Sequence, residues 1–105
     1  GVQYVDVKVG TGRAVKSTDT ITVNYIGWLT DGTKFDSSYD RGQPAQFPLN
    51  QVIKGWTEGL VGLQIGGERR LFIPGPEAYG ANPPQGSNIP ANATLIFDVT
   101  LVSIP

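Results

Sequence analysis

Glycine and proline divide this chain into short segments, because 14 of its 105 residues are glycine and 8 are proline. The segments between them are rich in β-branched and aromatic residues, a pattern that predicts strands joined by turns. Within Thr20–Leu29 the residues Ile21, Val23 and Tyr25 alternate with polar ones, so one face of this strand should be buried. The strands that we expect are Gln3–Val9, Thr20–Leu29, Lys34–Ser37, Gln46–Leu49, Arg69–Ile73 and Ala93–Ile104.

The period of the apolar residues changes once, after the fourth expected strand. Trp56, Leu60 and Leu63 share one helical face, which predicts a short helix over Thr57–Leu63. Because an isolated helix of this length is marginal in water, its apolar face should pack against the sheet. The long polar segment Pro74–Pro90 is expected to be a functional loop.

These elements fit one small domain. A chain of 105 residues can bury a single core and has little room for a second. We therefore expect one domain over residues 1–105, of the α+β class. Its predicted architecture is a curved antiparallel sheet of five to six strands, a half-barrel wrapped around the short helix.

The absence of cysteine and histidine narrows the chemistry of the chain. Thiol nucleophiles and histidine-based triads are excluded, and zinc would find only carboxylate ligands. The net charge of −1 gives no reason to expect nucleic acid. No apolar run approaches the roughly 20 residues that span a bilayer. The compartment stays open, with the cytoplasm slightly favoured over a domain cut from an exported or larger protein.

The segment Gly32–Arg41, GTKFDSSYDR, gathers carboxylates, hydroxyls, an aromatic ring and an arginine directly after a strand. Asp36 and Arg41 can form a solvated surface ion pair, which is the common case. If Phe35 instead faces an apolar cavity, Asp36 needs partners there, and Arg41 and the hydroxyl of Tyr25 are the natural ones.

Other interpretations of these residues stay open at this point. Asp36 and Asp40 also fit the paired carboxylates of a glycoside hydrolase, although closely spaced acidic residues in a loop are usually solvated. Each aromatic residue taken singly is better explained as part of an ordinary core. Their joint occurrence favours an aromatic-walled pocket, formed by Tyr25, Phe35, Phe47, Trp56, Tyr79 and Phe97.

Four blocks of sequence, in this order, carry a resemblance to a known family. They are VNYIGWLTDGTKFDSSYDRGQP, VIKGWTEGL, the AYG triplet of PEAYGANPPQG, and IPANATLIFDVTLVSI. The chain resembles the FKBP-type peptidyl-prolyl cis-trans isomerases, immunophilins that bind tacrolimus and rapamycin, over essentially its whole length. The resemblance implies a monomeric enzyme without cofactor or metal that accelerates rotation about X-Pro bonds, in proline-containing peptides and unfolded proteins.

The resemblance also assigns roles around a prolyl-binding pocket. Trp56 would form its floor, and the Ile53 backbone N–H and the Tyr79 hydroxyl would bond ligand carbonyls. Ser37, Ser38 and Asp40 would be turn residues. The implied catalytic residues are Tyr25, Asp36, Tyr79 and Phe97, and the implied ligand-binding residues are Phe35, Arg41, Phe47, Val52, Ile53, Trp56 and Ile89.

The chain departs from the family's pattern at two places. Ala45 stands where prototype members often carry a second aromatic residue, and the loop Gly80–Ile89 differs, which bears on substrate preference and macrolide partners. The first rival function is therefore a proline-recognising binding or scaffold module with little turnover. A carbohydrate-binding domain that uses Trp28 and Tyr39 is the second. Chaperone activity is expected to be weak, because no inserted domain interrupts the chain near Tyr79.

Overall fold

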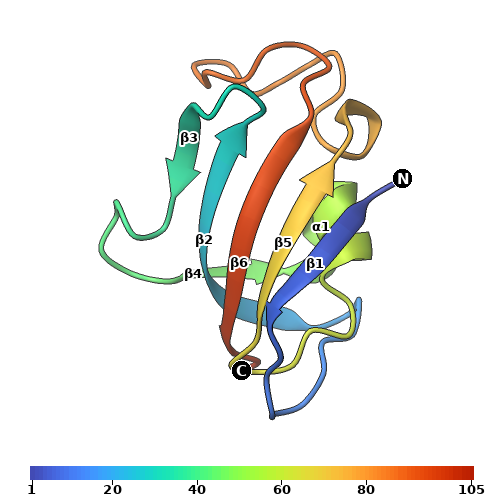
Figure 1. Cartoon of the computed structure of the whole chain (residues 1–105), viewed down its shortest axis with the longest axis vertical. Helices are drawn as coiled ribbons and strands as arrows, with labels where there is room; N and C mark the ends of the chain where they lie inside the picture. Colours follow the sequence, from blue (N-terminus) through green and yellow to red (C-terminus); the bar gives the residue numbers. More distant parts are fainter.

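The computed structural model describes all residues from Gly1 to Pro105. The chain forms a six-stranded sheet, one α-helix and two short 3-10 helices (Figure 1). All pairings are antiparallel, in the order β1-β5-β6-β2-β3, and β4 pairs with β2. The elements are β1 Gln3–Lys8, β2 Thr20–Leu29, β3 Lys34–Ser37, β4 Ala45–Pro48, η1 Leu49–Gln51, α1 Lys54–Gly59, β5 Glu68–Ile73, η2 Gly75–Glu77 and β6 Leu95–Ser103.

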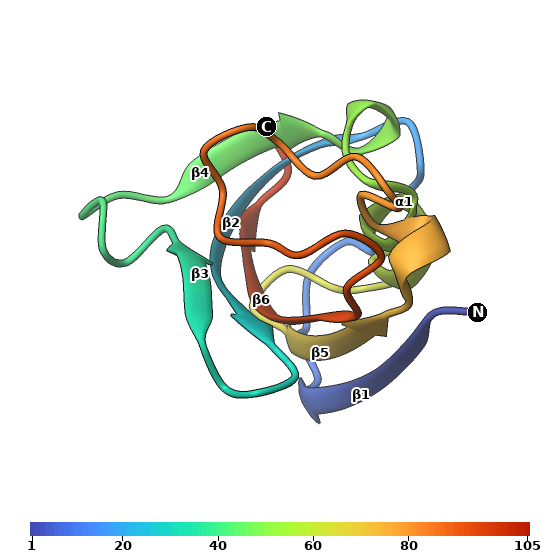
Figure 2. The ribbon, with the colours of Figure 1, turned by 90° about the horizontal axis from the view of Figure 1, so that it is seen from above.

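The sheet curves around α1. Seen from above, the strands follow an arc with α1 on its concave side (Figure 2). The long strand β2 supports this shape, since β4 and β3 share one of its edges in succession while β6 occupies the other. The predicted α+β class, with a curved antiparallel sheet around one short helix, is confirmed.

The concave face of the sheet forms the hydrophobic core. Buried and partly exposed residues alternate strictly along β2, and nearly so along β6, as the sequence pattern predicted for the first of them. The inward residues of these two strands are Ile21, Val23, Tyr25, Leu29, Leu95, Phe97, Val99 and Leu101. The outward residues leave the convex face more exposed.

The predicted helix Thr57–Leu63 is wrong in its bounds. The helix spans Lys54–Gly59, and the chain then reaches Gly62 with φ of 89°, a left-handed conformation that no α-helix continues through. The apolar spacing nevertheless identified buried residues, since the expected face is buried throughout: Trp56, Leu60 and Leu63.

The remaining boundaries differ little from the predicted ones. Strand ends shift by one or two residues, which is the usual uncertainty at an element's end. The segment Pro74–Pro90 is not wholly irregular, because η2 lies within it. Neither α1 nor the 3-10 helices have the length and apolar character needed to cross a membrane.

Two glycines bring α1 directly onto β5. A Cβ atom on Gly55 would lie 2.4 Å from Cγ2 of Ile73, and one on Gly59 would lie 2.9 Å from Cδ2 of Leu71. Both β5 side chains are fully buried. The helix backbone therefore occupies space that any larger residue would need.

Gly55→Ala should destabilise the fold by about 1–3 kcal/mol, the usual cost of overpacking a core. Helix propensity alone predicts the opposite sign, since alanine is favoured over glycine by about 1 kcal/mol. Urea unfolding followed by circular dichroism measures the difference. In an Ile73→Ala background the same substitution should be neutral or stabilising, because the clashing atoms are gone. Equal or higher stability of the single variant would contradict the contact.

Candidate active site

A cavity of about 320 Å³ lies beside α1 on the concave side of the sheet. Its lining is mostly hydrophobic and comes from four strands, the end of η1 and the segment that follows it, α1, and the loop after η2. These residues are far apart in the chain, so the cavity exists only in the folded protein. The lining consists of Tyr25, Asp36, Phe47, Gln51, Val52, Ile53, Trp56, Tyr79 and Phe97.

Trp56 is the centre of the aromatic packing. The rings of Tyr25, Phe47 and Phe97 meet its indole edge to face, at centroid distances of 5.2, 5.4 and 5.3 Å and interplanar angles of 86°, 89° and 87°. Such pairs add about 0.5–1.5 kcal/mol each beyond the burial of their area. Trp56 is only 4% exposed, and its indole N–H has no hydrogen-bond partner. The cavity therefore has an aromatic floor that three neighbouring rings hold in place.

Gly27 makes room for the wall on the β2–β6 side. It pairs with Phe97 across the two strands, and a Cβ atom there would lie 2.6 Å from Cζ of Phe35 and 2.9 Å from Cε1 of Phe97. Phe35 packs edge-on against Phe97, with ring centroids 5.5 Å apart. Phe35 thus supports the wall from outside the lining instead of facing the cavity.

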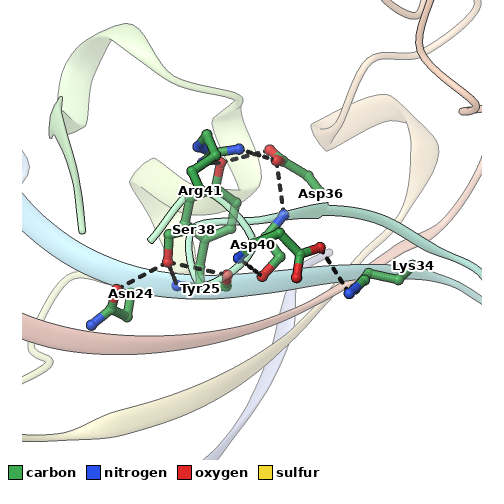
Figure 3. Close-up of polar contacts among 8 residues, drawn as sticks. Asn24, Tyr25, Lys34, Asp36, Ser38, Asp40 and Arg41 are labelled. Carbon is green, nitrogen blue, oxygen red and sulfur yellow. Dashed lines mark hydrogen bonds and ion pairs between the residues drawn. The ribbon is translucent and has the colours of Figure 1, made fainter. Parts of the chain in front are cut away.

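The Asp36 carboxylate is fixed at the rim of the cavity (Figure 3). The Tyr25 hydroxyl donates to its Oδ2 at 2.6 Å, and Nη1 of Arg41 and the backbone N–H of Ser37 donate to its Oδ1 at 2.5 and 2.9 Å. Nη2 of Arg41 also donates to the Tyr25 hydroxyl at 2.7 Å. The expected group of Tyr25, Asp36 and Arg41 therefore forms a closed hydrogen-bonded triangle.

These contacts set the charge of the rim. Burial raises the pKa of the Asp36 carboxyl, but the hydrogen bonds from Tyr25 and Arg41 outweigh it and hold the pKa below its usual range. Burial, with the bond to Asp36 second, raises the pKa of Tyr25 to about 12. Burial and then the charge of Asp36 also raise the pKa of Tyr79. At neutral pH the cavity therefore holds one carboxylate and two protonated phenols.

Two donors at the cavity make no hydrogen bond within the chain. The backbone N–H of Ile53 precedes α1 and is not used by any backbone carbonyl or side chain, and the hydroxyl of Tyr79 is likewise unpaired. Both residues line the cavity. The family resemblance implies these same two groups as donors to ligand carbonyls, a role that stays a prediction.

Sequence reasoning missed the contributions of Gln51 and Ser38. Gln51 lines the cavity, although it is exposed and no sequence pattern indicated a role for it. Ser38 was expected to be a plain turn residue, but it is fully buried. Its hydroxyl accepts the backbone N–H of Tyr25 at 2.8 Å and donates to Oδ1 of Asn24 at 3.1 Å (Figure 3). Ser38 thereby holds Tyr25 in place beside Asp36.

Other residues singled out from the sequence lie outside the lining. Ile89 is buried and Ala45 lies in β4 opposite Val23, and neither lines the cavity. Asp40 is 59% exposed and pairs with Lys34 at 2.8 Å, as the solvated alternative predicted. The paired-carboxylate interpretation has no support in this arrangement.

The aromatic residues of the carbohydrate alternative are not together in the cavity either. Trp28 lines a separate groove on the outer face, where the guanidinium of Arg70 lies 6.0 Å from its ring. Tyr39 is 54% exposed in the segment after β3.

The sequence and the fold match a known family. The family model of the FKBP-type peptidyl-prolyl cis-trans isomerases matches residues 11–102. The chain belongs to this family. The resemblance seen in the four sequence blocks is thereby confirmed.

Relatives within the FKBP family match nearly the whole chain. It is 55% identical over 104 residues to the FKBP-type peptidyl-prolyl cis-trans isomerase FkpA of Aeromonas hydrophila, covering 99% of the chain and 38% of that protein. It is 48% identical over 106 residues to the FK506-binding protein of Neisseria meningitidis serogroup B, covering 99% of the chain and 96% of that protein. The chain thus spans less than half the length of FkpA.

Solved FKBP structures share the fold closely. The crystal structure of FkpA from Escherichia coli aligns with a TM-score of 0.92 at 48% identity, covering 99% of this chain and 48% of that one. The crystal structure of AtFKBP13 aligns with a TM-score of 0.90 at 33% identity, covering 100% and 94%.

Tyr25→Phe should raise the pKa of Asp36, because it removes the Tyr25 hydrogen bond, which lowers this pKa more than any other contact. Titration of the Asp36 carboxyl carbon by NMR measures the change. Tyr39→Phe, a phenol-to-phenyl substitution at an exposed site, should leave the pKa of Asp36 unchanged. An unchanged Asp36 pKa in Tyr25→Phe would contradict the hydrogen-bonded triangle.

The lowered pKa of Asp36 also makes the stability of the fold depend on pH. Since the folded-state pKa of Asp36 is lowered, its stabilising contribution is present above the unfolded value of 3.8 and is lost as the pH falls through the folded value. Acidification should therefore cost the wild type more stability than it costs Asp36→Asn. Urea midpoints at neutral and acidic pH make this comparison.

Proposed function

We propose that the chain accelerates cis–trans isomerisation of X-Pro bonds in proline-containing peptides and unfolded polypeptides. The observation that carries the proposal is the apolar aromatic cavity with a fixed carboxylate at its rim, held by Tyr25 and Arg41. Family membership supports it, as does the isomerase activity in the name of the FkpA relatives. We infer that residues 1–105 act as one domain, because their buried apolar residues form a single cluster. The family resemblance favours a monomer.

The reaction suits a site of this kind. Rotation about an X-Pro bond disrupts amide resonance, with a barrier of about 18–20 kcal/mol. The planar amide is more dipolar than the twisted one, so an apolar cavity disfavours the ground state relative to the transition state. No covalent bond is broken, and neither a nucleophile nor a redox group is needed. Catalysis then rests on shape and on fixed charges.

Each cavity residue has a place in this mechanism. The prolyl ring lies over Trp56, between Tyr25 and Phe97, where its apolar surface is removed from water. The free donors of Ile53 and Tyr79 bond the substrate's carbonyl oxygens and fix its backbone while the amide turns. The Asp36 carboxylate acts as a fixed charge near the twisting carbonyl and transfers no proton, since Tyr25 and Arg41 keep it ionised.

Asp36→Asn should lower kcat/KM about tenfold, which corresponds to about 1.4 kcal/mol of transition-state stabilisation. Asp40→Asn is the matched control: it removes a carboxylate four positions away that is exposed and lies outside the cavity. That variant should retain wild-type activity. NMR exchange spectroscopy on a prolyl peptide measures both rates. Full activity of a folded Asp36→Asn protein would make Asp36 structural only.

We also propose that the cavity binds tacrolimus and rapamycin. The aromatic walls accept their pipecolyl rings as they accept proline, and the free donors of Ile53 and Tyr79 meet their carbonyl groups. The relative from Neisseria meningitidis bears the name FK506-binding protein, which supports this proposal.

Tacrolimus should change the fluorescence of Trp56, since the ligand would cover the indole. The titration is cleanest in a Trp28→Phe background, because Trp28 is the only other tryptophan and lies on the outer face. Saturable change confirms the pocket, and its absence in Trp28→Phe would contradict it. Saturable binding without any acceleration of prolyl exchange would instead identify a binding module with little turnover.

A further inference from the structure

Arg69 is a buried charge that the cavity does not use. It lies in β5 next to Arg70, yet it is only 5% exposed. Burial of a guanidinium is costly unless its donors are paired. Its partners come from two different elements, β1 and the end of α1, so the Arg69 side chain links the two.

On one side, Arg69 binds the carbonyl groups at the end of α1. Its Nη1 donates to the carbonyl oxygens of Gly59 at 2.9 Å and Val61 at 3.1 Å. The last carbonyls of a helix lack partners within the helix and carry partial negative charge. No basic residue of α1 itself lies in its last turn. Arg69 supplies the missing cation from the sheet.

On the other side, Arg69 binds the edge strand β1. Its Nε donates to Oδ1 of Asp6 at 2.7 Å, and its guanidinium carbon lies 4.1 Å from the centroid of the Tyr4 ring. Every residue of β1 is exposed, so its side chains add little to the core, and the strand is attached chiefly by its pairing with β5. Val2, just before β1, also packs close to the helix, because a Cβ atom on Gly59 would meet it at 3.2 Å.

We propose that Arg69 is a positioning residue for the cavity floor, with β1 as the brace behind it. The inference rests on the proposed isomerase function. Trp56 precedes Gly59 by three residues in the same helical turn, and Ile53 is the residue from which the helix starts. A shift of the helix end therefore moves both the floor and one ligand donor.

The helix α1 has few features of its own that fix its position on the sheet. The helix has six residues and no side-chain cap at its start. Gly55 and Gly59 allow close approach to β5 but provide no side chains that interlock with it. Trp56 packs against three rings, and the Thr57 hydroxyl donates to the carbonyl oxygen of Leu49 at 2.6 Å. The two hydrogen bonds from Arg69 add a hold at the end of the helix opposite to Ile53.

The test compares the same substitution at adjacent positions. Arg69→Met removes the side-chain hydrogen bonds to α1 and β1 and keeps the backbone pairing of β5 with β1. Arg70→Met removes a guanidinium on the opposite face of β5, where Nη2 of Arg70 binds Asp98 at 2.9 Å and the group lies over Trp28. The chain has two tryptophans, so each variant has its own NMR reporter in the indole N–H signals.

Arg69→Met should shift or broaden the Trp56 indole signal and leave that of Trp28 in place. A displacement of about 1 Å can cost about a hundredfold in rate, and we expect about tenfold in kcat/KM here because β5 still supports the helix. Arg70→Met should move the Trp28 signal and leave kcat/KM within about twofold of the wild type. Arg69→Lys, which keeps the charge but fewer donors, should restore part of the loss.

A purely structural role predicts a different result. Arg69→Met would then unfold at lower urea, while the folded protein kept both its Trp56 signal and its kcat/KM, and this outcome would overturn the proposal. If Arg69→Met does not fold, Asp6→Ala tests the brace alone, with the same direction and a smaller effect. Absence of isomerase activity in the wild type would contradict the proposed function. The Trp56 indole signal of Arg69→Met would still show whether Arg69 positions the cavity floor.

Discussion

The close packing of α1 on β5 is the contact on which the cavity depends. Because Gly55 and Gly59 lack side chains, the helix backbone lies against Ile73 and Leu71 and Trp56 reaches the centre of the curved sheet. Three further aromatic rings then close around the indole, edge to face. A helix held further from the sheet would leave these rings without a common partner, and the cavity without a floor.

Tyr25 joins the apolar and the charged parts of the site. Its ring packs against Trp56 as a wall, while its hydroxyl binds Asp36 and accepts a bond from Arg41. Burial beside an apolar cavity raises the pKa of a carboxyl group. At Asp36 the hydrogen bonds from Tyr25 and Arg41 reverse this effect. The site can therefore be dry enough to favour a twisted amide and still hold a fixed negative charge.

The parts of the structure that could be predicted from the sequence are those governed by local periodicity or by a long motif. Strict alternation in β2 identified both the strand and its buried face, since a shift by one residue would expose Ile21, Val23 and Tyr25 together. The pocket residues came from the family resemblance, and most of them do line one cavity. The helix ends were not predictable in this way, because the apolar spacing continues past Gly62, where the backbone turns left-handed.

What the sequence concealed are contacts whose partners are distant in the chain. Arg69 and Arg70 are adjacent in the sequence, but successive residues of a strand point to opposite faces of the sheet. One guanidinium is therefore buried beneath the end of α1 and the other lies over Trp28 on the outer face. Ser38 is a similar case, since the partner of its hydroxyl is the backbone N–H of Tyr25 in the neighbouring strand. Polar residues of this kind carry no periodic signal, and their roles follow only from the strands and helices that the apolar pattern has already placed.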